Sequence, residues 1–144
     1  MTAPKKWKAS RDPLLRGDAI TGVRVPVAAA NDSIIRHVLY LEGPGRETPY
    51  LSASESMAAA SRFAQAGGVW KTSVKMAQAN GVGHIGNSAL LSLMKGNGKG
   101  KAKWDDPFEV MQARRYVEQW SEHLLDFRGT SEPQTAIHRI FEKA

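Results

Sequence analysis

The chain has 144 residues, of which 42% are hydrophobic, and it carries a formal net charge of +6 at pH 7. This length and composition predict a single compact domain over residues 1–144 and exclude a wholly disordered chain. The absence of cysteine excludes disulfides, thiolate metal ligands and covalent thiol chemistry. Because no apolar run approaches the roughly 18 residues of a membrane span and the N-terminus lacks the apolar stretch of a secretion signal, we expect a soluble protein.

The basic residues gather in two segments. Residues 1–16 carry +4, and the segment KGNGKGKAK at residues 95–103 also carries +4, which leaves −2 for the rest of the chain. We expect the first to be a basic, flexible N-terminal segment. The second segment could bind the phosphate backbone of a nucleic acid, because glycine permits close approach and lysine supplies mobile positive charge. A flexible, solvated loop has the same composition, so both interpretations stay open.

The residue pattern predicts an α+β domain with a small mixed or antiparallel sheet, followed by helices. Residues 22–29 and 33–41 are rich in β-branched residues and predict strands, the first of them at an edge because of Pro26. Another extended segment ends at residues 52–54. Residues 69–76 alternate between apolar and polar side chains, which predicts a half-exposed strand.

The end of the segment at residues 52–54 predicts the start of a helix. Ser52 and Glu55 have the spacing of a capping box, and an alanine-rich stretch follows them. Such a helix start also presents backbone N–H groups and the positive end of the helix dipole, which together suit a phosphate. Both a routine cap and a nucleotide site therefore fit this stretch.

Three further helices are predicted in the second half. Residues 87–96 combine an asparagine cap, apolar residues at helical spacing and a glycine stop. The longest helical pattern begins near Pro107, includes Phe127 and stops at Gly129, so it predicts one long helix. A capping-box spacing at residues 131–134 precedes a predicted terminal helix that closes over the core.

The common catalytic and metal-binding signatures are missing from the sequence. The four histidines are far apart, and without a His-x-x-x-His pair no zinc site is expected. There is no phosphate-binding Gly-Lys-Ser/Thr loop and no Gly-x-Ser-x-Gly elbow. The string GVGHIG at residues 81–86 lacks the flanking strands of a dinucleotide fingerprint and predicts a turn.

One string resembles a known family. The residues YLSASE at 50–55, followed by Ala60 and Phe63, resemble the Ser-Thr-Ser block of the arginine-type ADP-ribosyltransferase superfamily, with Ala53 at the threonine position. In that family the block closes a strand of the NAD cleft. The resemblance implies NAD as co-substrate, no metal, and Ser52 and Ser54 framing the nicotinamide ribose.

The same resemblance implies an aromatic side chain near the nicotinamide, for which Phe63 and Trp70 are the candidates. It also implies an arginine on an early strand that binds the phosphates or the ribose of NAD. Arg36 in SIIRHVLYL is the best match to this arginine, and Arg24 is the second.

The family further supplies a catalytic glutamate, usually in a Glu-x-Glu or Gln-x-Glu string on a late strand, and this chain has no such string. By its position after the lysine-rich segment, Glu109 is the first candidate, although Asp106 and Glu109 also have the spacing of a helix cap. Glu118 and Glu122 are the alternatives. A carboxylate is required because cleavage of the nicotinamide–ribose bond develops positive charge on the sugar, while fixed donors hold the pyrophosphate.

A small, basic, cysteine-free domain with this block is similar to the C-terminal toxin modules of bacterial interference systems. The similarity implies transfer of ADP-ribose to a macromolecular acceptor, a protein or a nucleic acid, for example RNA or a protein with an acidic surface. The sequence does not identify the acceptor, and a small molecule or water would also serve. It also implies delivery into the cytoplasm of a target cell by a larger secreted protein, and a cognate immunity protein as partner.

Two other function classes fit the sequence. In a metal-independent ribonuclease toxin, His37, His84 or His123 would act as general acid or base, and the lysines would bind RNA. In a non-enzymatic nucleic-acid-binding module, the lysine-rich segment and Trp104 would make the contacts, and the serines would only cap helices.

Overall fold

The computed structural model describes residues 7–8, 11–27, 34, 37–38, 48–64, 67–94 and 107–144. These residues form the predicted α+β domain, built on a six-stranded sheet in which neighbouring strands are antiparallel. In spatial order the strands are β4 (Gly83–Ile85), β5 (Glu122–Asp126), β2 (Tyr50–Ser54), β1 (Leu14–Asp18), β3 (Gly68–Thr72) and β6 (Glu142–Lys143). None of the helices in the described ranges has the length and apolarity that crossing a bilayer requires.

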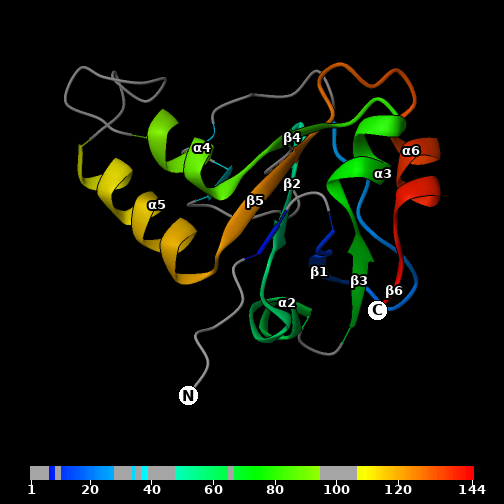
Figure 1. The fold of residues 1–144 in the computed structure, drawn as a ribbon, viewed down its shortest axis with the longest axis horizontal. Helices are drawn as coiled ribbons and strands as arrows, with labels where there is room; N and C mark the ends of the chain where they lie inside the picture. The colour runs from blue at the N-terminus through cyan, green and yellow to red at the C-terminus, as the bar shows by residue number, and fades with distance from the viewer. Residues whose placement is uncertain are drawn as a thin grey trace.

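In the same part of the chain, five helices surround the sheet: α2 (Met57–Ala64), α3 (Val74–Ala79), α4 (Asn87–Leu93), α5 (Pro107–Gln119) and α6 (Pro133–Ile140). Figure 1 shows α4 and α5 together beside β5, and α3 and α6 together near β3 and β6. Helix α2 lies apart from both pairs, below the strands in this view (Figure 1).

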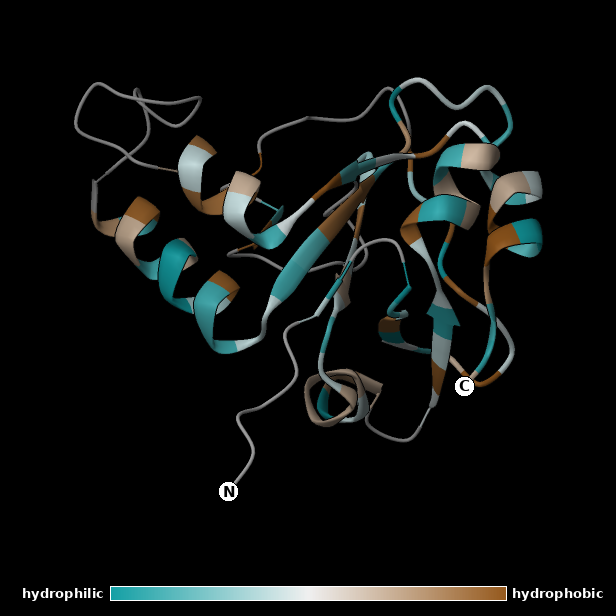
Figure 2. Ribbon diagram, in the orientation of Figure 1, coloured by the Kyte–Doolittle hydropathy of each residue, from teal (hydrophilic) through white to brown (hydrophobic). Residues whose placement is uncertain are grey.

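Two hydrophobic clusters cover the two faces of the sheet, because successive residues of a strand point to opposite faces. In β5, Leu124 belongs to the cluster that includes Val117 of α5, whereas Leu125 belongs to the cluster that includes Ile137 of α6. Both leucines are fully buried, and burial of one such side chain stabilises the fold by about 1.5–3 kcal/mol. Figure 2 shows that β5 turns from hydrophilic, where it follows α5, to hydrophobic in the middle of the sheet.

Neither of the two strands predicted early in the chain is observed. Residues 22–27 form no strand, and residues 28–29 lie outside the described residues. Ile34, His37 and Val38, which are the described part of the predicted strand 33–41, are helical. Ile34 and Val38 are both buried, and their four-residue spacing places them on one face of a helix, so burial of that face outweighs β propensity.

The strand predicted at residues 69–76 is confirmed only in its first half. Strand β3 ends at Thr72, and Ser73 caps α3, because its Oγ accepts a hydrogen bond from the Met76 N–H at 3.1 Å. Val74 and Ala77 are buried in α3. Their spacing of three is helical, whereas a strand would have placed Met76 on the same face as Val74, and Met76 is exposed.

The long helix predicted through Phe127 is divided at Ser121, which has a φ of 47°. A non-glycine residue with this left-handed conformation cannot continue a right-handed helix. Helix α5 therefore ends at Gln119, and the apolar residues that follow become strand β5, which pairs with both β2 and β4. Leu124 and Phe127 match helical spacing in the sequence, but they pack against opposite faces of the sheet.

Neither predicted capping box forms. Ser52 lies inside β2, and it is Ser56 that caps α2, through a 3.2 Å hydrogen bond from the Ala59 N–H to its Oγ. Glu132 is the N-cap of α6, and its side chain makes no capping hydrogen bond. The predicted helices at residues 87–96 and at the C-terminus are confirmed as α4 and α6, and the chain then returns to the sheet as β6.

Candidate functional site

A pocket of about 440 Å³ lies between α2, the end of α5 and the three central strands of the sheet. Small-molecule sites have volumes of roughly 300–1,000 Å³, so this pocket is large enough for part of a dinucleotide. Its lining residues come from segments that are far apart in the sequence: Leu15, Arg16, Gly17, Val38, Ser52, Ala53, Ser54, Ala60, Arg62, Phe63, Tyr116, Trp120 and Glu122.

Arg16 supplies a buried cation to the wall of this pocket, with only 5% of its surface exposed. Its Nε and Nη2 both lie 2.9 Å from Oδ2 of Asp18, two residues further along β1. Its Nη1 donates to the backbone carbonyl of Ser52 at 2.8 Å. A buried charge needs such partners, and here they also fix the orientation of the guanidinium group.

Gly17 allows α2 to lie directly on β1. A Cβ at this position would meet the backbone oxygen of Ala60 at 2.2 Å and the backbone nitrogen of Ala64 at 2.3 Å. Both are backbone atoms, so a side chain at position 17 would require α2 to move. The close approach brings the helix that carries Phe63 to the pocket.

Glu122 supplies a carboxylate on the other side of Ser52. It is the first residue of β5 and only 8% exposed, and its Oε2 accepts a 2.7 Å hydrogen bond from Ser52 Oγ. In the register of β2 and β5, Ser54 is opposite Glu122 and Ser52 is opposite Leu124. The contact is therefore diagonal, between side chains on one face of the sheet.

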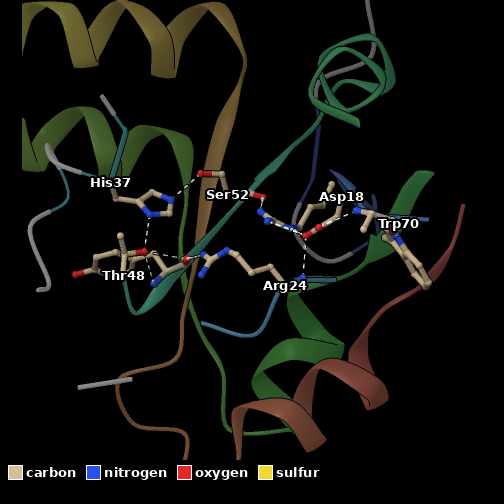
Figure 3. Close-up of polar contacts among 9 residues, drawn as sticks. Asp18, Arg24, His37, Thr48, Ser52 and Trp70 are labelled. Carbon is tan, nitrogen blue, oxygen red and sulfur yellow. Dashed lines mark hydrogen bonds and ion pairs between the residues drawn. The ribbon is translucent and has the colours of Figure 1, made fainter. Parts of the chain in front are cut away.

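His37 contacts Ser52 from a third direction. Figure 3 shows its ring between Thr48 and Ser52, with a hydrogen bond to each. The Nδ1–Thr48 Oγ1 and Nε2–Ser52 Oγ distances are both 2.7 Å, and His37 is 1% exposed. Ser52 therefore has contacts to a histidine and a glutamate through its hydroxyl, and to an arginine through its carbonyl.

An aromatic and cationic wall completes the pocket. The rings of Phe63 and Trp120 meet edge to face, with centroids 5.2 Å apart, and the guanidinium carbon of Arg62 lies 4.9 Å from the Trp120 ring centroid. Phe63 is 44% exposed, and all three residues line the pocket. Aromatic faces and a cation suit a planar or negatively charged ligand.

Of the site residues suggested by the sequence, the structure brings together Ser52, Ser54, Phe63 and the alternative glutamate Glu122 in this pocket. Ser54 also holds the chain at the end of α5, because its Oγ donates to the backbone carbonyl of Trp120 at 2.6 Å. Both serines of the block therefore lie in strand β2, and neither caps a helix.

The other suggested residues lie elsewhere. Glu109 is exposed in the first turn of α5 and does not line the pocket, because that turn is at the far end of the helix from β5. Trp70 in β3 donates from Nε1 to the Ala19 carbonyl at 3.0 Å and does not line the pocket either. Arg36 lies outside the described residues, and Arg24 donates to the Tyr50 carbonyl at 3.1 Å without lining the pocket.

Arg16 was not singled out from the sequence, and Glu122 was only an alternative to Glu109. Arg16 follows two leucines and precedes Gly17, a pattern that suits a buried strand with a close backbone contact. Its charge alone places Arg16 with the basic segment 1–16, which conceals that pattern. Glu122 was hidden inside the apparent long helix. The lysine-rich segment 95–103 and Trp104 lie outside the described residues.

A second polar cluster lies on the opposite face of β5 from Glu122, because neighbouring residues of a strand alternate in direction. His123 Nε2 lies 2.7 Å from Oε2 of Glu55, His123 Nδ1 lies 2.9 Å from Nε2 of His84, and the Trp7 ring centroid is 4.6 Å from that of His123. Burial, and then the neighbouring His123, lower the pKa of His84 to about 4. Burial also lowers the pKa of His123, against the opposing effect of Glu55.

No protein-family model matches the chain, and no significant match is found among curated proteins or solved structures. Within the ranges that the structure describes, no three histidine or carboxylate side chains are grouped closely enough to hold a metal ion. The functional interpretation therefore depends on the pocket around Ser52 and on the resemblance of the string that contains it.

Proposed function

We propose that the chain is an NAD-dependent ADP-ribosyltransferase, which cleaves the nicotinamide–ribose bond and passes ADP-ribose to a macromolecular acceptor. The observation that carries this proposal is the position of Ser52, whose carbonyl contacts Arg16 at 2.8 Å and whose hydroxyl contacts Glu122 at 2.7 Å. The string around Ser52 resembles that superfamily. The family also requires an arginine on an early strand and a glutamate on a late strand, and β1 and β5 offer them in the same pocket.

The proposed roles follow from the charges. Arg16 holds phosphate or ribose oxygens of NAD, Ser52 orients Glu122, and the carboxylate of Glu122 faces the positive charge that develops on the ribose. The bond between ribose C1′ and the nicotinamide nitrogen breaks, and its electron pair leaves with nicotinamide. The acceptor's nucleophile then forms the new bond to C1′ and releases its proton.

Phe63 and Trp120 provide the aromatic surface for the nicotinamide ring in this proposal, since ring faces and edges favour stacked or edge-on contacts. Glu122 takes the place of Glu109 as the proposed glutamate, because Glu122 lines the pocket and Glu109 does not. Arg16 is the proposed arginine, because it lines the pocket from the early strand β1.

The proposed acceptor is RNA or a protein with an acidic surface, in keeping with the net charge of +6. The resemblance to toxin modules extends the proposal to how the chain is delivered and regulated. We propose that it is the effector domain of a larger secreted protein, acts in the cytoplasm of a target cell and is held inactive by an immunity protein.

The proposal is tested by incubating the chain with labelled NAD and a cell extract, and then treating the product with protease or nuclease. We expect nicotinamide release and a labelled macromolecule, and the enzyme that removes the label identifies the class of acceptor. Arg16→Lys should lose most of the turnover, because lysine cannot reproduce the forked contacts to Asp18 and Ser52.

Absence of nicotinamide release by the folded wild-type chain would overturn the proposal. Metal-free cleavage of RNA by the same preparation would favour the ribonuclease alternative. Salt-sensitive binding to RNA without any turnover would favour a nucleic-acid-binding module.

A further inference from the structure

Four side chains form a continuous row of hydrogen bonds that ends on the proposed catalytic carboxylate. In order they are Thr48, His37, Ser52 and Glu122, and each of the three contacts is 2.7 Å long. Figure 3 shows the part of the row from Thr48 through His37 to Ser52. Thr48 and His37 are 2% and 1% exposed, so water does not compete for these bonds.

We propose that His37 is a positioning residue, which directs the hydroxyl proton of Ser52 onto Glu122. This inference rests on the proposed function, because it concerns the orientation and charge of the carboxylate that stabilises the transition state. It assigns a role to a histidine that lies outside the lining of the pocket.

The direction of each hydrogen bond follows from counting protons. An ionised carboxylate only accepts, so the single hydroxyl proton of Ser52 points to Glu122. Ser52 Oγ must then accept from its other neighbour, which requires a proton on Nε2 of His37. A histidine protonated on Nδ1 alone would instead compete with Glu122 for the serine proton.

The contacts of Thr48 at the other end of the ring are compatible with this tautomer. Its Oγ1 accepts from the Tyr50 N–H at 3.2 Å, and its proton can go either to Nδ1 of His37 at 2.7 Å or to the Tyr50 carbonyl at 3.1 Å. The Tyr50 carbonyl also accepts from Arg24 Nη2, so it keeps a donor when the Thr48 proton goes to the ring. With a neutral His37 that carries its proton on Nε2, each of the three contacts in the row has one donor and one acceptor.

All three hydrogen bonds then run in one direction, from Thr48 to Glu122. Hydrogen bonds in such a row polarise one another, and the last one is charge-assisted. The first member, Thr48, is buried and contacts the backbone of Tyr50, so the row begins inside the protein and not at its surface. His37 is therefore placed to orient Ser52 rather than to exchange protons with a substrate or with solvent.

Two substitutions of His37 separate this role from simple packing. The side-chain amide nitrogen of glutamine extends about as far as Nε2 of histidine, so His37→Gln keeps a donor near Ser52. The shorter asparagine reaches only about as far as Nδ1, so His37→Asn leaves Ser52 without that donor. Both substitutions remove a buried ring, and both should lower the melting temperature by similar amounts.

We expect His37→Asn to reduce kcat for nicotinamide release by about tenfold or more while KM for NAD changes by less than about threefold, because transition-state charge stabilisation depends on Glu122 orientation. His37→Gln should recover a large part of the lost kcat. Thr130→Val is the control for loss of a buried hydrogen bond, since Thr130 Oγ1 donates to the Gly81 carbonyl at 2.8 Å and does not line the pocket.

The outcomes distinguish this inference from the function on which it rests. No nicotinamide release by wild type overturns the proposed function. An active wild type together with equal kcat losses in His37→Asn, His37→Gln and Thr130→Val overturns the positioning role alone. Nitrogen-15 NMR of the His37 ring supplies a readout that needs no turnover: a proton on Nε2 supports the role, and a ring protonated only on Nδ1 overturns it.

Discussion

Ser52 and Glu122 lie on the neighbouring strands β2 and β5, and the hydroxyl of the serine donates a 2.7 Å hydrogen bond to the carboxylate of the glutamate. They are 70 residues apart in the sequence. The backbone carbonyl of the same serine accepts from Arg16 on the other neighbouring strand, β1. Ser52 therefore contacts one residue of each charge, Arg16 and Glu122. The predictions below concern these three residues and the elements that hold them in place.

The first prediction compares two glutamates. Glu122→Gln should reduce nicotinamide release by about two orders of magnitude or more, because glutamine keeps the shape of the side chain but not its negative charge. Glu109→Gln should leave release near wild type, since Glu109 is exposed on α5 and does not line the pocket. Initial rates with labelled NAD measure both, and the opposite ranking would move the catalytic acid to the first turn of α5.

The second prediction separates two serines. Ser52→Ala should lower turnover, because it removes the hydroxyl between His37 and Glu122. Ser56→Ala should instead lower the free energy of unfolding by about 1 kcal/mol through loss of the α2 cap, with turnover largely retained. Denaturant unfolding and NAD turnover are measured on both variants. Equal losses of turnover would contradict the separation of the two roles and would show that the pocket depends on the α2 cap.

The third prediction concerns the contact between β1 and α2. Gly17→Ala should destabilise the protein by about 1–3 kcal/mol or more, because its Cβ would overlap backbone atoms of Ala60 and Ala64. Gly22→Ala is the matched control, since a Cβ there meets nothing within 4 Å. Thermal unfolding compares the two variants. If Gly17→Ala melts like Gly22→Ala, the close packing of α2 on β1 is wrong.

The fourth prediction is a loss of stability in acid. The pKa of His84 is about 4 in the folded chain against 6.5 for an ordinary histidine, so the unfolded state binds the proton first as the pH falls. The free energy of unfolding should therefore be highest above pH 6.5 and should fall as the pH drops from 6.5 through about 4. The lowered pKa of His123 acts in the same direction.

His84→Gln tests the source of this pH dependence, because glutamine can still donate to His123 but does not titrate. Its free energy of unfolding should fall less steeply than that of wild type between pH 6.5 and pH 4. His138→Gln, at an exposed position on α6, serves as the control. Parallel pH profiles for wild type and His84→Gln would assign the acid sensitivity to other groups.

The α+β class and the helices α4 and α6 follow from the sequence alone. These features are local. A cap, a run of apolar residues at helical spacing and a glycine stop act within a few residues of one another, so a pattern along the chain is enough to detect them. The string around Ser52 could be singled out for the same reason.

The end of helix α5 within the long apolar pattern after Pro107 depends on tertiary contacts. The backbone turns at Ser121, and Asn87 from α4 holds the turn by donating to the carbonyls of Val117 and Glu122, each at 3.0 Å. The apolar residues beyond the turn match both a helix and a strand, and the choice depends on the neighbouring strands β2 and β4. No residue within the pattern itself marks this change.

Only the tertiary structure brings two particular charged residues to the candidate site. Arg16 and Glu122 meet only because β1 and β5 are placed on either side of β2, and strand order is set by long-range pairing rather than by any local spacing. In the sequence, Arg16 belongs to a basic segment and Glu122 to an apparent helix face. Each is buried and contacts Ser52 in the fold, where hydrogen bonds from distant parts of the chain supply the partners that a buried charge requires.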